Sequence, residues 1–418
     1  MDFEKIAYAE RENTANYRNY LHRHPEVSGK EFATMKFIEG ELDKLGIPWE
    51  EVPDAGIVGH IRGGAGAGRT LLLRADIDAL PLTEDSENLT GPKANVSENQ
   101  GACHACGHDG HTAMLLTSAK LLNERKDELK GEILLFFERG EEVGYAVFPM
   151  LEWLQKRYPN LDGCFGIHVK SDLEEGKISA QPGGVMSGFV VYGATLTGSG
   201  GHNSRPDRCK NPIDCFNAIY SDLAGVRMRC ASPYDFLTNA ITGVNSGTKD
   251  NIIPNSLSFC GMSRFYNAEK AGKPFRHELE TIVSKNAEIY GCQYRFDYCI
   301  GPTPGLNNNA DMARIAQDAM KKHMSAGTVV AGEPWMASES VAYYYLLYPG
   351  VFIFLGTENK EHGMGAEHHN PKFDLNSGIL YKGVAATLSF AFEFLNGDIH
   401  VAFEKPDITI DDLRKTRQ

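Results

Sequence analysis

One stretch of the chain concentrates side chains that bind metal ions in proteins. Within nine positions it has five of them, namely Cys103, His104, Cys106, His108 and His111. Only a glycine separates Cys106 from His108, so in an extended turn both side chains can face one point. Thiolate and imidazole are ligands for borderline-soft divalent cations such as zinc. We therefore expect a metal site here, with structural packing and redox thiol chemistry as the alternatives.

Further candidate ligands follow apolar segments elsewhere in the chain. Glu141 and Glu142 come after the run 133–137, and there one carboxylate can bind a metal while its neighbour shuttles a proton to and from water. His168 ends the apolar segment 163–168, and His369 lies in Glu367-His-His-Asn-Pro371. Taken singly, Glu141 and Glu142 also fit a solvated acidic turn, and His168 also fits a structural histidine. The segment around His369 also fits an ordinary loop. All of them follow expected strands, where open α/β sheets place their sites.

The elements that must position these residues alternate along the first half of the chain. Ser28-Gly-Lys-Glu31 fits a capping box, and Met35, Ile38 and Leu42 then recur at helical spacing up to Gly46. A second helix is expected over 111–125. Short apolar runs predict buried strands at 57–61, 71–73, 133–137 and 164–169. This pattern predicts an α/β fold with a mostly parallel central sheet flanked by helices.

The pattern changes near Gly188. Strands are expected at 189–196, 240–244, 257–265 and 293–298, with helices beginning at 211 and 277. Their order is βαββαβ, the ferredoxin-like split unit, which is long enough to fold by itself. Alternation resumes after 301, with helices near 309–323 and 377–395 around a strand at 351–355. We expect a catalytic domain of residues 1–187 and 301–418, interrupted by an inserted domain of residues 188–300. The polar tail after Glu404 is expected to fray.

Composition excludes several classes of protein. Of the 418 residues, 42% are hydrophobic and 23% charged, which is typical of a globular chain rather than a disordered one. The net charge of -13 is opposite to that of a non-specific nucleic-acid binder. Nine cysteines, an odd number in a long chain, argue against a disulfide framework. No signal-peptide pattern opens the chain and the apolar runs are short, so we expect a cytoplasmic protein with no membrane contact.

Over residues 14–395 the sequence resembles the binuclear metal-dependent amidohydrolases of the aminoacylase/carboxypeptidase superfamily. It is most similar to the group with hippurate hydrolase, indole-acetyl-amino-acid hydrolases and aminobenzoyl-glutamate hydrolase. The resemblance rests on motifs that occur in the same order, namely Leu21–Glu26, Arg74–Pro81, His104–His111, Glu141-Glu142, Gly166-Ile-His168, Gly200-Gly-His202, Asn251–Pro254 and His369–Phe373.

The resemblance implies a role for each matching residue. Two divalent ions, zinc or manganese, would be held by Cys106, His108, Glu142, His168 and His369. Glu141 would be the general base and then the general acid toward water that the ions acidify. The inserted domain would be a lid and a homodimerisation surface.

Three residues of that domain would serve the substrate. His202 would reach across the dimer and polarise the scissile carbonyl. Asn251 and Arg264 would hold the substrate's carboxylate, a task that suits an arginine fork.

The expected function is hydrolysis of the amide bond of N-acyl amino acids, including N-aroyl ones. A dipeptidase or carboxypeptidase of the same superfamily, a catalytically silent metal or ligand binder, and a structural zinc protein are the alternatives. This chain departs from the usual Phe-Gln-Pro-Ala-Glu-Glu, because it has Phe137-Glu138-Arg139-Gly140-Glu141-Glu142. The extra charge pair beside the base either shifts its pKa or reshapes the loop.

Overall fold

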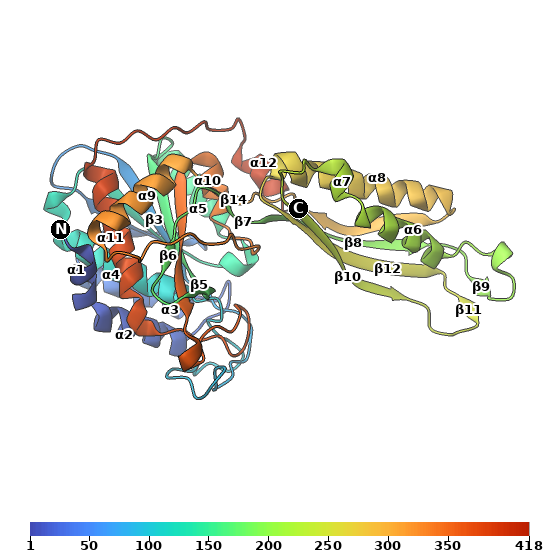
Figure 1. Cartoon of the computed structure of the whole chain (residues 1–418), viewed down its shortest axis with the longest axis horizontal. Helices are drawn as coiled ribbons and strands as arrows, with labels where there is room; N and C mark the ends of the chain where they lie inside the picture. Colours follow the sequence, from blue (N-terminus) through green and yellow to red (C-terminus); the bar gives the residue numbers. More distant parts are fainter. Residues whose placement is uncertain (418) are drawn as a thin grey trace. The chain divides into compact units, whose positions relative to one another are not determined.

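The computed structural model describes residues 1–417, which divide into two compact units (Figure 1). Unit 1 consists of Met1–Gly183, Asn307–Glu333 and Tyr343–Pro406. Unit 2 consists of Gly184–Leu306, Pro334–Ala342 and the residues from Asp407 onward. The short strands β7 (Gly183–Met186) and β14 (Leu306–Asn308) lie where the chain passes from one unit to the other.

A seven-stranded sheet forms the centre of unit 1, in the order β1-β2-β4-β3-β5-β15-β6. Its strands are β1 (Trp49–Val52), β2 (Gly56–Arg62), β3 (Thr70–Asp76), β4 (Glu132–Glu138), β5 (Gly163–Glu174), β6 (Ile178–Ser179) and β15 (Gly350–Glu358). The four central strands β4, β3, β5 and β15 are parallel. Strand β2 pairs antiparallel with β4, β6 pairs antiparallel with β15, and β1 pairs antiparallel with β2. The α/β prediction is confirmed, and each expected apolar run lies within a strand.

Helices cover both faces of this sheet, which is why the strands are apolar throughout rather than alternating. On one face, the ring of Phe165 in β5 stacks on the ring of Phe390 in the helix Tyr381–Asn396, with 4.9 Å between the ring centroids. On the other face, Phe136 in β4 meets Trp153 and Tyr344 at 5.7 and 6.2 Å. The helices of this unit are α1 (Phe3–Ala9), α2 (Arg11–Arg23), α3 (Phe32–Lys44), α4 (His108–Glu124), α5 (Val147–Arg157), α9 (Ala310–His323), α10 (Ala342–Leu347) and α11 (Tyr381–Asn396).

The predicted capping box at the start of α3 is wrong. The helix begins at Phe32, and Glu31 makes no side-chain cap. Ser28 instead donates its hydroxyl to Asp78 Oδ2 at 2.6 Å. The Glu31 carboxylate accepts from the backbone of Gly29 and Gly140. Both side chains thus hydrogen-bond to segments that are distant in the sequence instead of capping the helix. A local sequence pattern does not reveal that such distant partners compete with the cap.

One helical segment, Ser377–Asn396, is long and apolar enough to cross a membrane by length and composition. However, 72% of its most apolar window is buried inside the fold. It includes α11, which packs against α1, α4 and α9. Its composition is therefore that of a core helix of a globular domain.

Unit 2 has a four-stranded antiparallel sheet in the order β10-β12-β8-β13. Its elements follow the chain as β8 (Gly188–Thr197), α6 (Pro212–Ala224), α7 (Arg227–Cys230), β10 (Leu237–Ser246), β12 (Ser256–Phe265), α8 (Lys273–Ile289) and β13 (Gln293–Ile300). This is the predicted βαββαβ order, with α6 and α8 packed together. A small pair, β9 (Gly201–His202) and β11 (Ile252–Ile253), extends from it. The tail does not simply fray, because Thr409 and Asp412 cap a helix α12 (Ile410–Lys415) reciprocally.

A buried ionic network joins α2 to the start of α4. Arg18 Nε and His22 Nδ1 each lie 2.8 Å from Asp109 Oδ2. His22 Nε2 lies 3.0 Å from Glu84 Oε1, which also accepts from Lys93 Nζ at 2.8 Å. All of these side chains are at most 2% exposed. The network therefore fixes the first turn of α4, where the expected metal ligand His108 lies.

We expect the Glu84 carboxylate to make stability depend on pH. Burial raises its pKa, but hydrogen bonds from His22, Lys93 and the Ser97 amide lower it to about 2, from an ordinary value of 4.5. A lowered pKa stabilises the fold above about pH 4.5, and this contribution is lost as the pH falls toward 2. Glu84→Gln should lose about 2–3 kcal/mol of unfolding free energy at pH 7.

Denaturant unfolding of wild type and variant at pH 7 and pH 3 measures this difference. The gap should narrow at pH 3, because the Glu84 carboxyl of the unfolded wild-type chain, with its ordinary pKa of 4.5, is protonated there while the folded carboxylate is still mostly ionised. The exposed Glu361 supplies the control Glu361→Gln, which should match wild type at both pH values. An equal gap between Glu84→Gln and wild type at both pH values would contradict the assignment.

Candidate metal centre

The five predicted metal ligands and the predicted base come together in unit 1. Three groups each have ligand atoms within 4.8 Å of one another, namely Cys106 with His108 and His168, Cys106 with Glu142 and His369, and His108 with Glu141 and Glu142. Shared members link the groups into one cluster. The residues come from the segment that leads into α4 and its first turn, the turn after β4, strand β5 and the loop before α11.

His168 does not end its strand as predicted, because β5 continues to Glu174. The pairing of β5 with β3 nevertheless stops at Gly166, which pairs with Arg74. His168 therefore lies just beyond the last residue at which β3 covers that side of β5. This is the strand-end position that an open α/β sheet offers to a site.

Neighbouring acceptors orient two imidazoles of the cluster. His108 Nδ1 lies 3.0 Å from the Asp78 carbonyl oxygen and 3.1 Å from Asp78 Oδ1. His168 Nδ1 lies 2.6 Å from the Val169 carbonyl oxygen. Each Nδ1 therefore carries the proton and donates it, which leaves the Nε2 lone pair for a ligand. His168 Nε2 lies 3.7 Å from Cys106 Sγ, so this lone pair faces the cluster.

The carboxylates are presented by a tight turn after β4. Glu141–Val143 form a single 3-10 turn between two glycines in the left-handed region, Gly140 (φ 59°) and Gly144 (φ 60°). Glu142 donates its backbone N–H to Asp78 Oδ2 at 3.1 Å. Its Oε1 lies 3.3 Å from His369 Nε2 and 3.9 Å from His108 Nε2.

The extra charges Glu138 and Arg139 belong to two separate networks. Arg139 Nε donates to Glu31 Oε2 at 3.0 Å, and Glu31 Oε1 accepts from Gly140 N at 2.8 Å. Glu138 Oε1 accepts from Arg74, and its Oε2 accepts from Tyr344. This charge pair therefore anchors the turn that carries Glu141.

A fourth group with metal-site spacing, Asp76 with His108 and His111, is explained by hydrogen bonds. His111 Nδ1 lies 2.6 Å from Asp76 Oδ1, and its Nε2 accepts from Val169 N at 3.0 Å. Both nitrogens of His111 are thus occupied. His368 is also engaged, because its Nε2 accepts from Ser171 N at 3.2 Å.

Asp76 and Asp78 had no expected role on the basis of the sequence. Both carboxylates are buried, and both hold histidines at the site. Burial raises the pKa of Asp76, but His108, His111 and Arg74 lower it well below its usual range. Their position at the end of an apolar strand could have indicated a role, because acidic residues are rarely buried in a packed core unless they are paired.

The cluster has the properties of a cation site. His108 Nε2 and Glu142 Oε1 are buried and have no hydrogen-bond partner among the described residues. Leaving such atoms without a hydrogen bond costs about 1–3 kcal/mol each. Burial also raises the pKa of the Cys106 thiol well above its ordinary value, so a thiolate here requires a nearby cation. Sulfur, imidazole and carboxylate together suit a borderline divalent ion, and the residues therefore fit a metal centre.

The other three predicted site residues belong to unit 2. His202, in β9, is exposed and its Nδ1 lies 2.9 Å from Ser204 Oγ. Asn251 is an exposed turn residue beside β11. Arg264, in β12, is half-buried, and its Nη1 donates to the Met336 carbonyl oxygen at 2.8 Å and to Ser338 Oγ at 3.0 Å. Burial lowers the pKa of Arg264.

Comparison with known proteins adds a family and several relatives. The model of "Peptidase family M20/M25/M40" matches residues 72–393. Thermostable carboxypeptidase 2 of Saccharolobus solfataricus is 35% identical over 384 residues, which are 91% of this chain and 94% of the relative. IAA-amino acid hydrolase ILR1-like 5 of Arabidopsis thaliana is 31% identical, over 90% of this chain and 86% of the relative.

Two proteins of Bacillus subtilis are also similar. N-acetylcysteine deacetylase is 33% identical over 367 residues, 87% of this chain and 92% of the relative. The crystal structure of the YXEP protein, described as a dinuclear metal binding peptidase from the M20 family, matches with a TM-score of 0.78 and 29% identity. The match covers 93% of this chain and 99% of that one.

Gly107 sets the spacing between Cys106 and His108, and we expect its replacement to weaken metal binding. Its φ of +91° belongs to the left-handed region, and an added Cβ would lie 2.3 Å from Val169 Cγ2. Gly107→Ala must therefore move the turn away from β5. Metal affinity, measured by titration against a competing chelator, should fall by about 10- to 100-fold.

Gly101→Ala is the matched control. Gly101 has a similar φ of +82°, but an added Cβ would meet nothing within 4 Å. This variant should lose about 1–2 kcal/mol of stability from backbone strain and keep its metal affinity. If both variants bind metal as wild type does, Gly107 does not set the ligand spacing.

Proposed function

The chain belongs to peptidase family M20/M25/M40, and we propose that it hydrolyses the amide bond of N-acyl or N-aroyl amino acids. It is a metal-dependent hydrolase of the amidohydrolase and peptidase type. The observation that carries the proposal is the convergence of one thiol, three imidazoles and two carboxylates in unit 1. The substrate class is supported by relatives named for N-acetylcysteine and IAA-amino acids.

The proposed ligands of the metal pair are those of the cluster, namely Cys106, His108, Glu142, His168 and His369. Zinc or manganese is the proposed ion at each position. When bound, two such ions supply Lewis acidity, which lowers the pKa of water and offsets the negative charge that develops on the scissile carbonyl oxygen. Asp78 and the Val169 carbonyl hold the protons on the Nδ1 atoms of His108 and His168. Their Nε2 lone pairs are thereby available without a change of tautomer.

Glu141 is the proposed general base. A carboxylate oxygen of Glu141 lies within 4.8 Å of ligand atoms of His108 and Glu142, so it is next to the metal cluster. The same side chain that takes a proton from water can deliver it to the departing amine. The Glu31 carboxylate, through Gly140 and Arg139, anchors the turn on which Glu141 sits.

Arg264 and Asn251 are proposed to hold the substrate's carboxylate. The guanidinium Nη1 of Arg264 is fixed by Met336 and Ser338, and a fixed fork loses less entropy when it binds a carboxylate. His202 is proposed to polarise the scissile carbonyl in the site of a partner subunit. This arrangement requires a homodimer through unit 2, which we propose together with a cytoplasmic location.

A carboxypeptidase is the second candidate function. A relative with that name has 35% identity to this chain. Both activities need a free carboxylate on the released amino acid, so Arg264 serves either one. They differ in the group on the other side of the amide. A comparison of hydrolysis rates distinguishes the two functions. One set of substrates is N-acetyl and N-benzoyl amino acids, and the other is dipeptides and longer peptides with the same C-terminal residue.

Glu141→Gln should separate metal binding from catalysis. The amide keeps the size of the side chain but cannot accept a proton, so kcat should fall by roughly 100-fold or more while metal content is unchanged. Glu142→Gln is the matched variant one residue away, and it should lose metal as well as activity. Metal analysis and N-acyl amino acid hydrolysis are measured on both. Full activity of Glu141→Gln would refute the base assignment.

His202→Ala tests the role across the dimer. The variant alone should lose turnover by about 10²- to 10³-fold, as for removal of one oxyanion donor. Mixing it with Glu141→Gln, under conditions of subunit exchange, should restore about a quarter of wild-type activity, because half of the dimers are mixed and each has one complete site. Unchanged turnover of His202→Ala, or no recovery on mixing after confirmed exchange, would contradict this role.

A further inference from the structure

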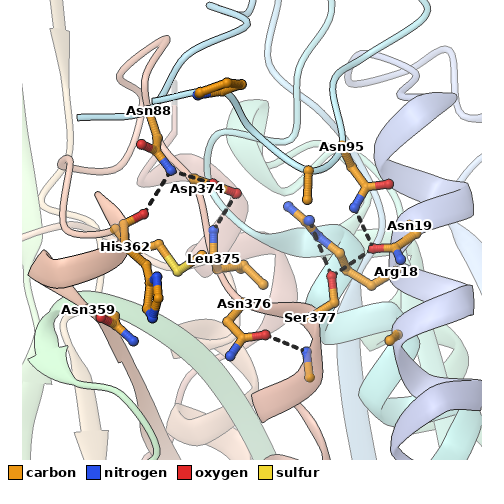
Figure 2. Close-up of a pocket in the computed structure, with 15 residues that line it drawn as sticks. Arg18, Asn19, Asn88, Asn95, Asn359, His362, Asp374, Leu375, Asn376 and Ser377 are labelled. Carbon is orange, nitrogen blue, oxygen red and sulfur yellow. Dashed lines mark hydrogen bonds between the residues drawn. The ribbon is translucent and has the colours of Figure 1, made fainter. Parts of the chain in front are cut away.

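Two arginines that are withdrawn from bulk water differ in whether a carboxylate balances their charge. Arg18 lines a cavity of about 560 Å³ in unit 1 (Figure 2), where its Nη1 donates to Ser377 Oγ at 3.4 Å. Its Nε lies 2.8 Å from Asp109 Oδ2, so its charge is balanced within the protein. Arg264 of unit 2 is half-buried, and no carboxylate of residues 1–417 forms an ion pair with it. Such an unbalanced charge favours the binding of an external anion.

Three oxygen atoms surround Nη1 of Arg264. The Met336 carbonyl oxygen lies at 2.8 Å, Ser338 Oγ at 3.0 Å and Ser187 Oγ at 3.2 Å. Because Nη1 has only two N–H donors, these acceptors occupy both of them. All three acceptors are neutral groups, so they fix the guanidinium in place without balancing its charge.

Ser187 connects the parts of this arrangement. Its side chain is buried, and its Oγ donates to the Met336 carbonyl oxygen at 2.7 Å while it accepts from Nη1 of Arg264. Its backbone N–H donates to the Ala337 carbonyl oxygen at 2.8 Å. The Met336 carbonyl oxygen therefore accepts from both Ser187 and Arg264. One serine thus holds the segment 335–338 against the guanidinium.

The other edge of the Arg264 guanidinium makes no such contact. In the part of the chain that the structure describes, Nε and Nη2 have no hydrogen-bond partner, and neither atom is fully buried. Their N–H bonds run parallel at the spacing of the two oxygens of a carboxylate. A carboxamide has only one such oxygen and can satisfy only one of the two donors. This edge therefore distinguishes a carboxylate from a carboxamide by charge and by shape.

We propose that Ser187 is a positioning residue that holds Nη1 of Arg264, so that the Nε–Nη2 edge is presented to the substrate's carboxylate. The inference rests on the proposed function, in which the substrate is an N-acyl amino acid. Without the Ser187 hydroxyl, Nη1 and the Met336 carbonyl each lose one partner, and the guanidinium is free to turn. A turned guanidinium keeps its charge but no longer presents two parallel N–H bonds. Ser187 thus acts on recognition of the carboxylate and not on cleavage of the amide.

A matched pair of ligands tests this role, namely N-benzoylglycine and N-benzoylglycinamide. They differ only in the terminal carboxylate, and glycine has no side chain that a particular pocket must accept. Binding is measured by calorimetry on the metal-loaded, full-length protein with Glu141→Gln, which prevents turnover. We expect the carboxylate to bind at least about 30-fold more tightly than the carboxamide. Added Ser187→Ala should reduce this ratio by about tenfold and leave the carboxamide affinity unchanged.

Two further variants show whether the effect belongs to Nη1. Ser263→Ala is the matched control, because Ser263 is a buried serine next to Arg264 whose Oγ has no hydrogen-bond partner among the described residues. It should keep the full ratio. Ser338→Ala removes another acceptor of Nη1 and should reduce the ratio by about threefold. If Ser187→Ala does not fold, Ser338→Ala decides.

The kinetic counterpart uses the chain with Glu141 intact. Ser187→Ala should raise KM for N-acyl amino acids by about tenfold and change kcat by less than about twofold. A wild-type chain that hydrolyses no N-acyl amino acid would refute the proposed function, whereas the binding ratio would still test Ser187. No binding of N-benzoylglycine, a ratio near one before Ser187→Ala, or an unchanged ratio after it would each overturn the inference.

Discussion

The Asp78 carboxylate is the interaction on which the candidate metal centre depends. Its Oδ1 and carbonyl oxygen hold His108 Nδ1, while its Oδ2 accepts from the Glu142 backbone and from the Ser28 hydroxyl. One buried carboxylate thus fixes the first turn of α4, the turn after β4 and the segment before α3. Burial raises the pKa of Asp78, but His108 and Ser28 lower it below its usual value. The carboxylate is therefore ionised, as its hydrogen bonds require.

Other buried charges around the centre also serve to position it. The network of Arg18, His22 and Asp109 fixes the residue after His108, and the pair of Glu31 and Arg139 holds the turn with Glu141. Buried ion pairs contribute little net stability, but breaking one leaves an uncompensated charge. Their strict geometry is what a metal site needs, since a small displacement of one ligand weakens the whole set. Around this centre, buried carboxylates such as Asp109 and Glu31 are thus paired with basic side chains.

Much of this architecture follows from local sequence patterns. Apolar runs such as 71–73 and 133–137 predict buried strands because helices cover both faces, and the βαββαβ order follows from alternating strands and helices. The cluster around Cys106 and the Glu141-Glu142 pair were identified by residue type and spacing, and the structure brings them together with His168 and His369. Their roles as ligands and base stay predictions, as do those of His202, Asn251 and Arg264.

What the sequence did not reveal are the hydrogen bonds between distant segments. Ser28 looked like a helix cap because its partner Asp78 is 50 residues away. Asp76 and Asp78 had no role for the same reason. Some side chains can hydrogen-bond either to a near neighbour in the sequence or to a distant residue. The packing of the fold determines which partner is used, and no local pattern encodes that packing.

Metal stoichiometry tests the central claim most directly. The full-length protein, saturated with zinc or manganese and freed of excess ion, is analysed by inductively coupled plasma mass spectrometry beside Cys106→Ser. We expect two ions per wild-type chain and a clear loss in the variant, because the thiolate belongs to two of the three linked ligand groups. A wild-type chain without bound ions, or a variant that keeps both of them, would contradict it.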